Sequence, residues 1–497
     1  MRPSKEIFVT SSESKSPLQQ SPVDVDWGTP IVSLVGAVLK TMRFWGCAIP
    51  VFLCHAHGQD DRRSALALTS ESQFRLPDDR PKLDREELRA CGLHVIESRR
   101  LVLVTDVVSS DVKDLPLLAD ALFEELERQQ GTLAPDLAKS DFQVTGYLID
   151  AKERFVKAGV LPPKQFAFRH GKNMGYQFWM NNQATDYYRR HLLLHEFVHC
   201  FMMCEHGMND IPPLWYTEGL AEYFATHQIQ ETISATRFGI LPPAVVGFEG
   251  WGRITEIRNI LTTEHGETKQ REQLLSVEGL LHPADNNFTD DLKYAQAWAI
   301  IWLIRNHQEL KAEFACFDRV RARKDFLDAE GRIPTKIWKR LTVLWPLYLD
   351  SLAEGFDTDR SFPALIPTET PWTDIQNSPL KVSVRSDKSW QSSGVLFTSG
   401  QSVTVSCSGR YTVHDQPKPW VSEPQGITID YHRGRPLGEV TAMVLSPTGA
   451  FLPQRVAVGT GREFAFAGDT ELWLQINDSA ARRAGNSGTA EITIKNR

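Results

Sequence analysis

The alternation of apolar and polar positions over residues 90–183 predicts a small mixed sheet with two helices. Short runs rich in β-branched and aromatic residues indicate strands at 93–97, 100–106, 142–149, 166–168 and 175–182. Apolar positions recur at helical spacing over 116–130 and 151–157. We expect a hairpin from the first two strands, and pairing of 166–168 with 175–182. This sheet is expected to lead into a long helix over 187–204.

The pattern changes twice in the second half of the chain. Residues 242–285 show no regular period and are expected to form loops, whereas 290–304 are strongly apolar and predict a helix, with further helices to about residue 352. After a proline- and threonine-bearing stretch at 362–379, short alternating runs separated by turns argue for a β-sandwich. These runs lie at 395–397, 402–406, 427–429, 442–445, 472–476 and 490–494.

The candidate chemistry lies on the 187–204 helix, which contains an H-E-x-x-H motif. Residues four apart on a helix share a face, so His195 and His199 can present two imidazole nitrogens to one zinc ion. Glu196, on the same turn, takes the general-base position of the motif. His191 shares that face one turn earlier, so a His191/His195 pair stays open, although only the 195/199 pair brackets a glutamate. The alternative to a metal site is a buried helix whose histidines only form hydrogen bonds.

A second helix is expected after the prolines at 212–213, because proline cannot continue a helix. This helix carries Glu218, which can return as the third protein ligand of a tetrahedral zinc with an open position for water. Glu222 falls one turn later on the same face. Its carboxylate is placed to accept the outer N–H of a ligating histidine.

Residues 195–199 and 215–224 resemble the two signature helices of the gluzincins, which are zinc metallopeptidases, and more narrowly the bacterial peptidase MA-like domains. The resemblance extends over about residues 90–355. It implies His195, His199 and Glu218 as zinc ligands, Glu196 as the general base, and His195 as the histidine that Glu222 orients.

The resemblance also implies an exposed edge strand that binds extended substrate by main-chain hydrogen bonds, and 175–182 is the candidate. Asn181 and Asn182 stand where aminopeptidase relatives carry an amine-binding glutamate, which argues against N-terminal exopeptidase activity. A Tyr-Ala-Gln helix similar to that of the family begins at Tyr294. Tyr294 could donate a hydrogen bond to the carbonyl oxygen as it becomes tetrahedral. A helix tyrosine with a satisfied hydroxyl is the equal alternative. Tyr223 and His206 are weaker candidates for the same role.

Residues 380–497 resemble the PA-I type galactose-binding lectins of bacteria. The resemblance rests on Trp390-x-x-x-Gly394, Pro424-Gln-Gly426, Pro436-Leu-Gly438 and the loop at 476–488. In that family an aspartate and an Asn-Asn pair bind calcium, which holds the sugar. Asp478 and Asn486 match, whereas Gly485 and Arg482 depart from the pattern. Calcium takes six to eight oxygen ligands, so a sandwich without a sugar site stays open beside a calcium-dependent lectin.

The beginning of the chain predicts export. Residues 1–29 are rich in Ser, Pro and charge and are expected to be disordered. Met42-Arg43, an apolar run at 44–53 and a small-x-small site before Gln59 have the features of a secretory signal, with translation starting at Met42. A single signal anchor over 31–53 is the alternative.

Composition narrows the class of protein. The 497 residues are 41% hydrophobic and 24% charged, as in a soluble globular protein, and the length indicates two or three domains. A net charge of −7 with scattered basic residues gives no basic patch of the kind that binds nucleic acid. The five cysteines outside the signal have no close-spaced framework, and Cys200 and Cys204 are expected to be packing residues rather than metal ligands.

The predicted fold class is α+β: a thermolysin-like zinc peptidase domain, with a small mixed sheet, a helical zinc site and a helical C-terminal lobe, followed by an all-β sandwich. The expected boundaries are a leader and signal at 1–58, a polar lead-in at 59–89, the peptidase domain at 90–355, a linker at 356–379 and the lectin-like sandwich at 380–497.

The expected function is that of a secreted or periplasmic zinc peptidase. Its partner would be a peptide or protein substrate, with a glycosylated protein as one option, and a membrane only if the N-terminal apolar segment is retained as an anchor. The alternative function is a carbohydrate- or surface-binding protein whose zinc domain is a non-hydrolytic scaffold.

Overall fold

The structure is a computed structural model that describes residues 74–163, 168–262, 276–281, 290–364, 370–372, 377–446 and 455–497. All of these belong to one compact unit of the chain, Ala67–Arg497. The predicted leader and signal lie outside the described residues, as does most of the strand expected at 166–168.

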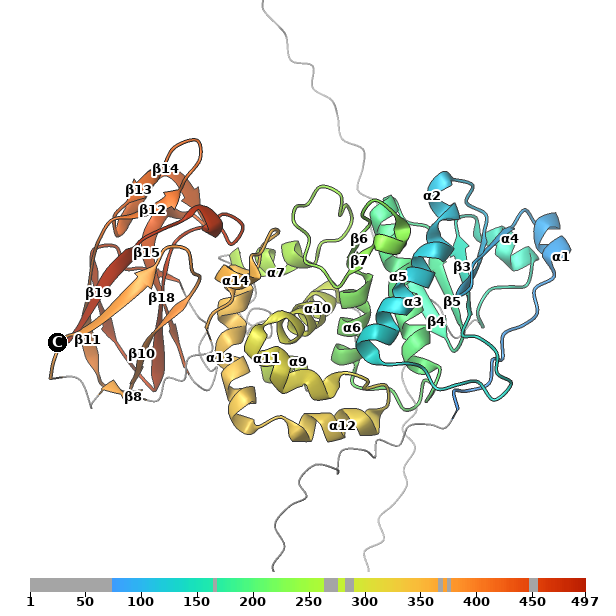
Figure 1. The fold of residues 1–497 in the computed structure, drawn as a ribbon, viewed down its shortest axis with the longest axis horizontal. Helices are drawn as coiled ribbons and strands as arrows, with labels where there is room; N and C mark the ends of the chain where they lie inside the picture. Colours follow the sequence, from blue (N-terminus) through green and yellow to red (C-terminus); the bar gives the residue numbers. More distant parts are fainter. Residues whose placement is uncertain are drawn as a thin grey trace, which may run out of the picture. The chain divides into compact units, whose positions relative to one another are not determined.

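A five-stranded mixed sheet opens this unit, in the spatial order β1-β2-β3-β5-β4. Figure 1 labels β3, β4 and β5 of this sheet. Its first two strands form the expected antiparallel hairpin, β2, β3 and β5 run parallel, and β4 is antiparallel to β5. The strands are β1 (His94–Glu97), β2 (Leu101–Thr105), β3 (Val144–Ile149), β4 (Gly171–Met174) and β5 (Gln177–Asn181).

The edge strand differs from the one predicted at 175–182. That segment contains β5, which pairs with β3 on one side and with β4 on the other, and β4 lies at the edge of the sheet. The consecutive Phe178, Trp179 and Met180 are all buried, which is the pattern of a strand covered on both faces. Gly175, at a φ of 57°, makes the tight turn between β4 and β5.

Two helical layers cover this sheet. The helices α3 (Leu115–Gln130) and α5 (Asp186–Met203) pack on one face, in a core that includes Phe178 and Met180. The short helices α1 (Arg85–Ala90) and α4 (Lys152–Lys157) contribute Leu88 and Phe155 to the opposite face, where they meet Trp179. The alternation of side chains along β5 therefore serves two separate cores.

The remaining helices extend the core beyond the sheet. Residues 242–285, expected to be loops, contain α7 (Arg253–Thr262) and α9 (Val277–Leu281). None of the described helices is both long and apolar enough to cross a membrane. The other helices of this part are α2 (Ser110–Lys113), α6 (Leu214–Ala225), α10 (Asp291–Asn306), α11 (Gln308–Glu313), α12 (Arg323–Arg332), α13 (Thr335–Ser351) and α14 (Thr358–Ser361), and a short pair β6 (His227–Gln228) and β7 (Arg237–Phe238) follows α6.

The C-terminal part is a β-sandwich-like pair of sheets with its own apolar core, as the alternating pattern predicted. One sheet has the order β14-β15-β18-β10-β8, with β16 beside β15, and the other has the order β17-β11-β19-β9. The strands are β8 (Thr370–Pro371), β9 (Leu380–Arg385), β10 (Gln391–Phe397), β11 (Ser402–Ser408), β14 (Gln425–His432), β15 (Arg435–Leu445), β16 (Val456–Ala457), β17 (Gly461–Ala465), β18 (Thr470–Ile476) and β19 (Thr489–Asn496), with a hairpin of β12 (Tyr411–His414) and β13 (Trp420–Ser422).

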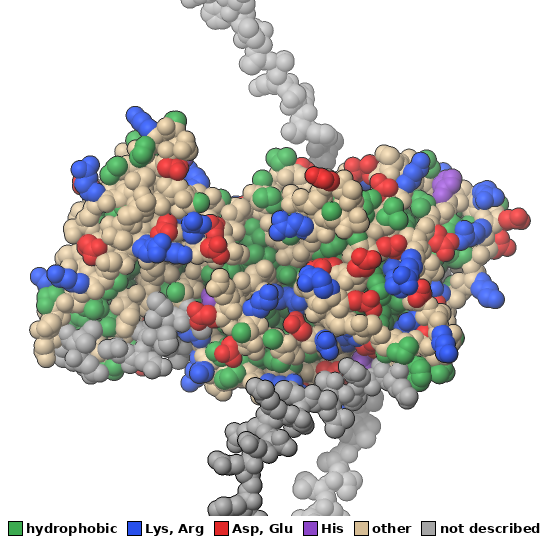
Figure 2. Space-filling view, viewed as in Figure 1, with side chains coloured by type: hydrophobic (Ala, Val, Ile, Leu, Met, Phe, Trp, Pro, Cys, Tyr) green, Lys and Arg blue, Asp and Glu red, His purple; other side chains and the backbone are tan. Residues whose placement is uncertain are grey.

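The described surface mixes charges of both signs. On the face seen in Figure 2, Lys and Arg side chains are interspersed with Asp and Glu over both the α+β part and the sandwich.

The close approach of α6 and α10 depends on a glycine. A Cβ added at Gly219 would lie 2.4 Å from the carbonyl oxygen of Ala297 and 2.8 Å from Cγ1 of Ile301. Real Cβ atoms do not approach a backbone oxygen so closely, so α6 can lie against α10 only with glycine at this position. Gly219 directly follows Glu218. The contact between α6 and α10 therefore helps to determine the position of the Glu218 carboxylate.

We predict that Gly219→Ala lowers the free energy of unfolding by about 1–3 kcal/mol, because the helices must separate to admit the methyl group. Urea unfolding followed by circular dichroism measures this change. Gly331→Ala in α12 is the matched control, since nothing lies within 4 Å of its added Cβ. That control should be neutral or stabilise the protein by up to about 1 kcal/mol, and an equal loss in both variants would contradict the steric argument.

Candidate metal centre

The predicted zinc ligands converge between α5 and α6. The Nε2 atoms of His195 and His199 lie 3.1 Å apart, and each is 3.2 Å from Oε2 of Glu218. Thr185 begins α5 by accepting a hydrogen bond from the backbone N–H of Tyr188, and α6 begins directly after Pro213. Two well-defined helix starts thus bring the histidines and the glutamate into one triangle.

This triangle fits a tetrahedral zinc ion. Bonds of about 2.0–2.1 Å at tetrahedral angles place ligand atoms about 3.3 Å apart, close to the separations of the two nitrogens and the oxygen. Both histidines are at least nine-tenths buried, and the side chain of Glu218 is 15% exposed. Two imidazoles and a carboxylate are the donor set of a catalytic zinc site with one position open.

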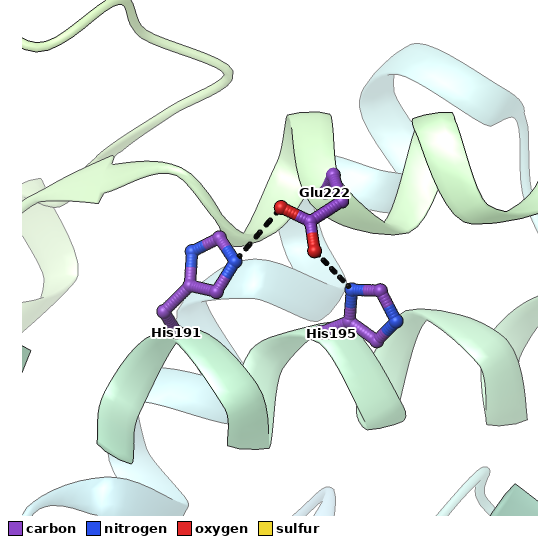
Figure 3. Close-up of side chains that lie close together, drawn as sticks. All are labelled: His191, His195 and Glu222. Carbon is purple, nitrogen blue, oxygen red and sulfur yellow. Dashed lines mark hydrogen bonds and ion pairs between the residues drawn. The ribbon is translucent and has the colours of Figure 1, made fainter. Parts of the chain in front are cut away.

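A second group on the same helices has the composition of a metal site but a different arrangement (Figure 3). The Nε2 atom of His191 lies 3.2 Å from Oε2 of Glu222, and Nδ1 of His195 lies 3.4 Å from Oε1. Both oxygens of Glu222 also accept hydrogen bonds from Arg253, at 2.8 and 3.0 Å. An arginine already neutralises this carboxylate, so we interpret Glu222 as the support for His195 rather than as a ligand.

Arg253 is a site residue that the sequence analysis missed. It is the first residue of α7 and is buried, with 8% of its surface exposed. Its Nη1 atom lies 3.6 Å from Oδ1 of Asp291, and its guanidinium carbon lies 5.4 Å from the ring centroid of Tyr294. Arg253 lies in a stretch without a regular period, and no motif links it to Glu222, so the sequence carried no signal for this contact.

Glu196 occupies a confined position beside the ligands. It is 5% exposed, and burial raises the pKa of its carboxyl above the usual range. A Cβ at Gly171, the first residue of the edge strand β4, would lie 2.3 Å from Oε1 of Glu196. Glycine at that point lets the carboxylate lie directly against the strand.

Tyr294, in the first turn of α10, lies beside His195. Its ring centroid is 6.2 Å from that of His195. Burial, followed by the negative charge of the nearby carboxylates, raises the pKa of its hydroxyl. The hydroxyl therefore stays protonated at neutral pH and can act as a hydrogen-bond donor.

The pKa of His195 is set by the balance between burial and the neighbouring carboxylates. Burial lowers the pKa of His195, but hydrogen bonds to Glu218 and Glu222 and their negative charges outweigh burial and raise it to about 10. Burial likewise opposes ionisation of Glu218, yet the electrostatic interaction with His199 and the hydrogen bond from His195 hold its pKa below the usual range.

The cysteines next to the centre are packing residues, as expected. Cys200 and Cys204 are buried, their Sγ atoms point to the backbone carbonyls of Gln177 and Phe201, and both are free thiols. Burial raises the pKa of each thiol. Neither belongs to a metal-capable group within the described residues.

The residues predicted to hold calcium lie together but face each other. Asp478 accepts hydrogen bonds from the Nδ2 atom of Asn486 at 2.9 Å and from the backbone N–H of Ser479. The Nε atom of Arg482 lies 3.4 Å from Asp478, and its terminal nitrogen donates to Asp430. Asn486 presents its nitrogen to Asp478, and its Oδ1 atom is buried without a hydrogen-bond partner among the described residues. Calcium takes six to eight oxygen ligands, and the calcium site stays a prediction.

Comparisons with known proteins give limited guidance. Over residues 192–328 the chain matches a family described as "Protein of unknown function (DUF1570)", and this segment contains the candidate ligands, Arg253 and Tyr294. No protein with a curated description matches the chain. Among solved structures, the chain is similar to one described as "EclA N-terminal domain; PllA-like lectin", at 15% identity over 24% of this chain and 96% of that chain, with a TM-score of 0.19. A TM-score of this size does not establish a shared fold. The resemblance to zinc peptidases stays a prediction.

We predict that zinc binding at pH 8 releases about one proton per chain, because zinc must displace the proton that His195 holds with a pKa of about 10. Zinc affinity should accordingly rise by about tenfold per pH unit and level off near pH 10. Calorimetric titration in buffers of different ionisation enthalpy counts the protons. Release close to zero at pH 8 would show that His195 is already neutral in the metal-free protein.

Proposed function

We propose that this protein is a zinc-dependent peptidase. The observation that carries the proposal is the triangle of the two Nε2 atoms and Oε2 of Glu218 at 3.1–3.2 Å, with Glu196 on the same helical turn as His195. This arrangement supports hydrolysis more than a scaffold role, because a purely structural zinc site is closed by four protein ligands and has no use for an adjacent carboxylate.

Each side chain has a distinct task in peptide-bond hydrolysis. Zinc, when bound, acts as a Lewis acid and lowers the pKa of water to about 7. Glu196 takes a proton from the attacking water and delivers it to the leaving amine nitrogen as the C–N bond breaks. Tyr294 donates a hydrogen bond to the carbonyl oxygen as that atom gains negative charge.

The raised pKa of Glu196 suits this exchange of protons. A general base works best when its pKa lies near the working pH, because it must both accept and return the proton. Burial raises the pKa of Glu196 in that direction. Contact with the position of Gly171 keeps the carboxylate beside the sheet edge.

The edge strand β4 is the candidate for binding substrate backbone. Within the described strands β4 pairs only with β5, which leaves its other side able to accept an extended peptide. Gly171 begins this strand next to Glu196, so a peptide paired with β4 would run past the general base. We further propose that the sandwich serves to target the substrate or its glycans and that the protein acts outside the cytoplasm.

Zinc content and turnover test the proposal together. We expect one zinc per chain in the purified protein, lost in Glu218→Ala because a ligand is removed. Glu196→Gln should retain zinc and lower the rate of hydrolysis of unfolded casein by about 10²–10⁴-fold. Metal analysis by mass spectrometry and release of labelled peptide measure the two quantities. Absence of zinc from the unaltered protein would reject the proposal and favour a binding protein built on the sandwich.

Tyr294→Phe tests the oxyanion role separately. The substitution removes only a hydroxyl, so zinc content should not change, while the turnover number should fall by about 10²–10³-fold. Tyr223→Phe is the control, because Tyr223 lies on α6 with its ring 5.2 Å from the guanidinium carbon of Arg305. Full activity of Tyr294→Phe would leave Tyr294 as a packing residue.

A further inference from the structure

Arg253 ties together three elements that surround the candidate metal centre. It begins α7, its guanidinium binds Glu222 of α6, and it lies beside Asp291 and Tyr294 in the first turn of α10. Within the described part of the chain, it is the one arginine or lysine that forms a salt bridge with Glu222.

The contact with Glu222 fixes the plane of the carboxylate. The Nε atom of Arg253 binds Oε2 at 3.0 Å and a terminal nitrogen binds Oε1 at 2.8 Å, which is the two-bonded arrangement that arginine alone provides. Each oxygen also faces one imidazole: Oε2 faces His191 and Oε1 faces His195. The orientation of the carboxylate therefore determines which way the ring of His195 is turned.

We propose that Arg253 is a positioning residue that sets the metal affinity of the centre by acting through Glu222 on His195. This proposal rests on the proposed zinc site. With Glu222 held in place, Nδ1 of His195 faces the carboxylate and Nε2 faces Glu218 and His199. Without Arg253, the buried carboxylate loses its permanent positive partner and is free to turn toward His191.

Zinc titration of the metal-free, full-length protein against a chromophoric chelator tests the proposal. Loss of a group that orients a ligand typically weakens metal binding by about 10–100-fold, and we expect a loss in that range for Arg253→Met. Arg253→Lys keeps the charge but cannot bind both oxygens, and it should also bind zinc more weakly than the unaltered protein.

Arg258→Met is the matched control. Arg258 lies on the same helix and forms a more exposed salt bridge, at 3.0 Å, with Glu354 instead of Glu222. Its replacement should leave zinc affinity within about threefold of the unaltered protein, since no ligand-orienting group is lost. Equal zinc affinity of Arg253→Met and Arg258→Met would overturn the proposal.

A double-mutant cycle with Glu222→Gln separates positioning from general damage. If Arg253 acts through Glu222, Arg253→Met should weaken zinc binding little further once Glu222→Gln is present, whereas fully additive losses would overturn the proposal. The double variant also removes both buried charges, so together with Arg253→Lys it completes the test if Arg253→Met does not fold.

The visible spectrum of the cobalt-substituted protein gives a second readout, because it reports ligand geometry. It should change in Arg253→Lys and stay unchanged in Arg258→Met, and an unchanged spectrum in both would count against positioning. If the unaltered protein binds no zinc, the zinc site itself fails. Zinc binding that is insensitive to Arg253 rejects only the positioning role.

Discussion

The arrangement of the centre depends on one buried carboxylate. Removing a charge from water is costly unless it is paired and hydrogen-bonded. Glu222 of α6 meets this condition with an arginine of α7 and two histidines of α5. These interactions with Glu222 in turn fix the positions of α5, α6 and α7 relative to one another. Binding a divalent cation in exchange for the proton on His195 adds one positive charge to a centre rich in carboxylates. The metal would therefore further compensate the negative charge of these carboxylates.

The parts of the site that the sequence predicted are those fixed by local geometry. A helical period places His195 and His199 on one face, and the same period places Glu222 one turn after Glu218. Arg253 comes 31 residues after Glu222 along the chain, and its contact exists only once α6 and α7 both pack against α10. The edge strand was misassigned for a similar reason, since neighbouring strands in a sheet are chosen by long-range pairing.

In the sandwich, too, the sequence pattern predicted the strands but not the contacts between side chains. Its strands follow from alternation and turns, and the structure confirms a two-sheet region with its own core. Residue types in the 476–488 loop suggested a calcium site, but the side chains have paired with one another. Residue types alone do not predict tertiary contacts. Two such contacts are the hydrogen bond from the amide of Asn486 to Asp478 and the one from Arg482 to Asp430.

The edge position of β4, which pairs only with β5 among the described strands, has a consequence for association between copies of the protein. An unpaired strand edge is a template for any other strand, and proteins limit this risk with short edges and charged side chains. β4 has only four residues and carries Lys172. Such an edge is too short to support stable strand exchange or fibre growth, so it favours brief pairing with a flexible chain over lasting self-association.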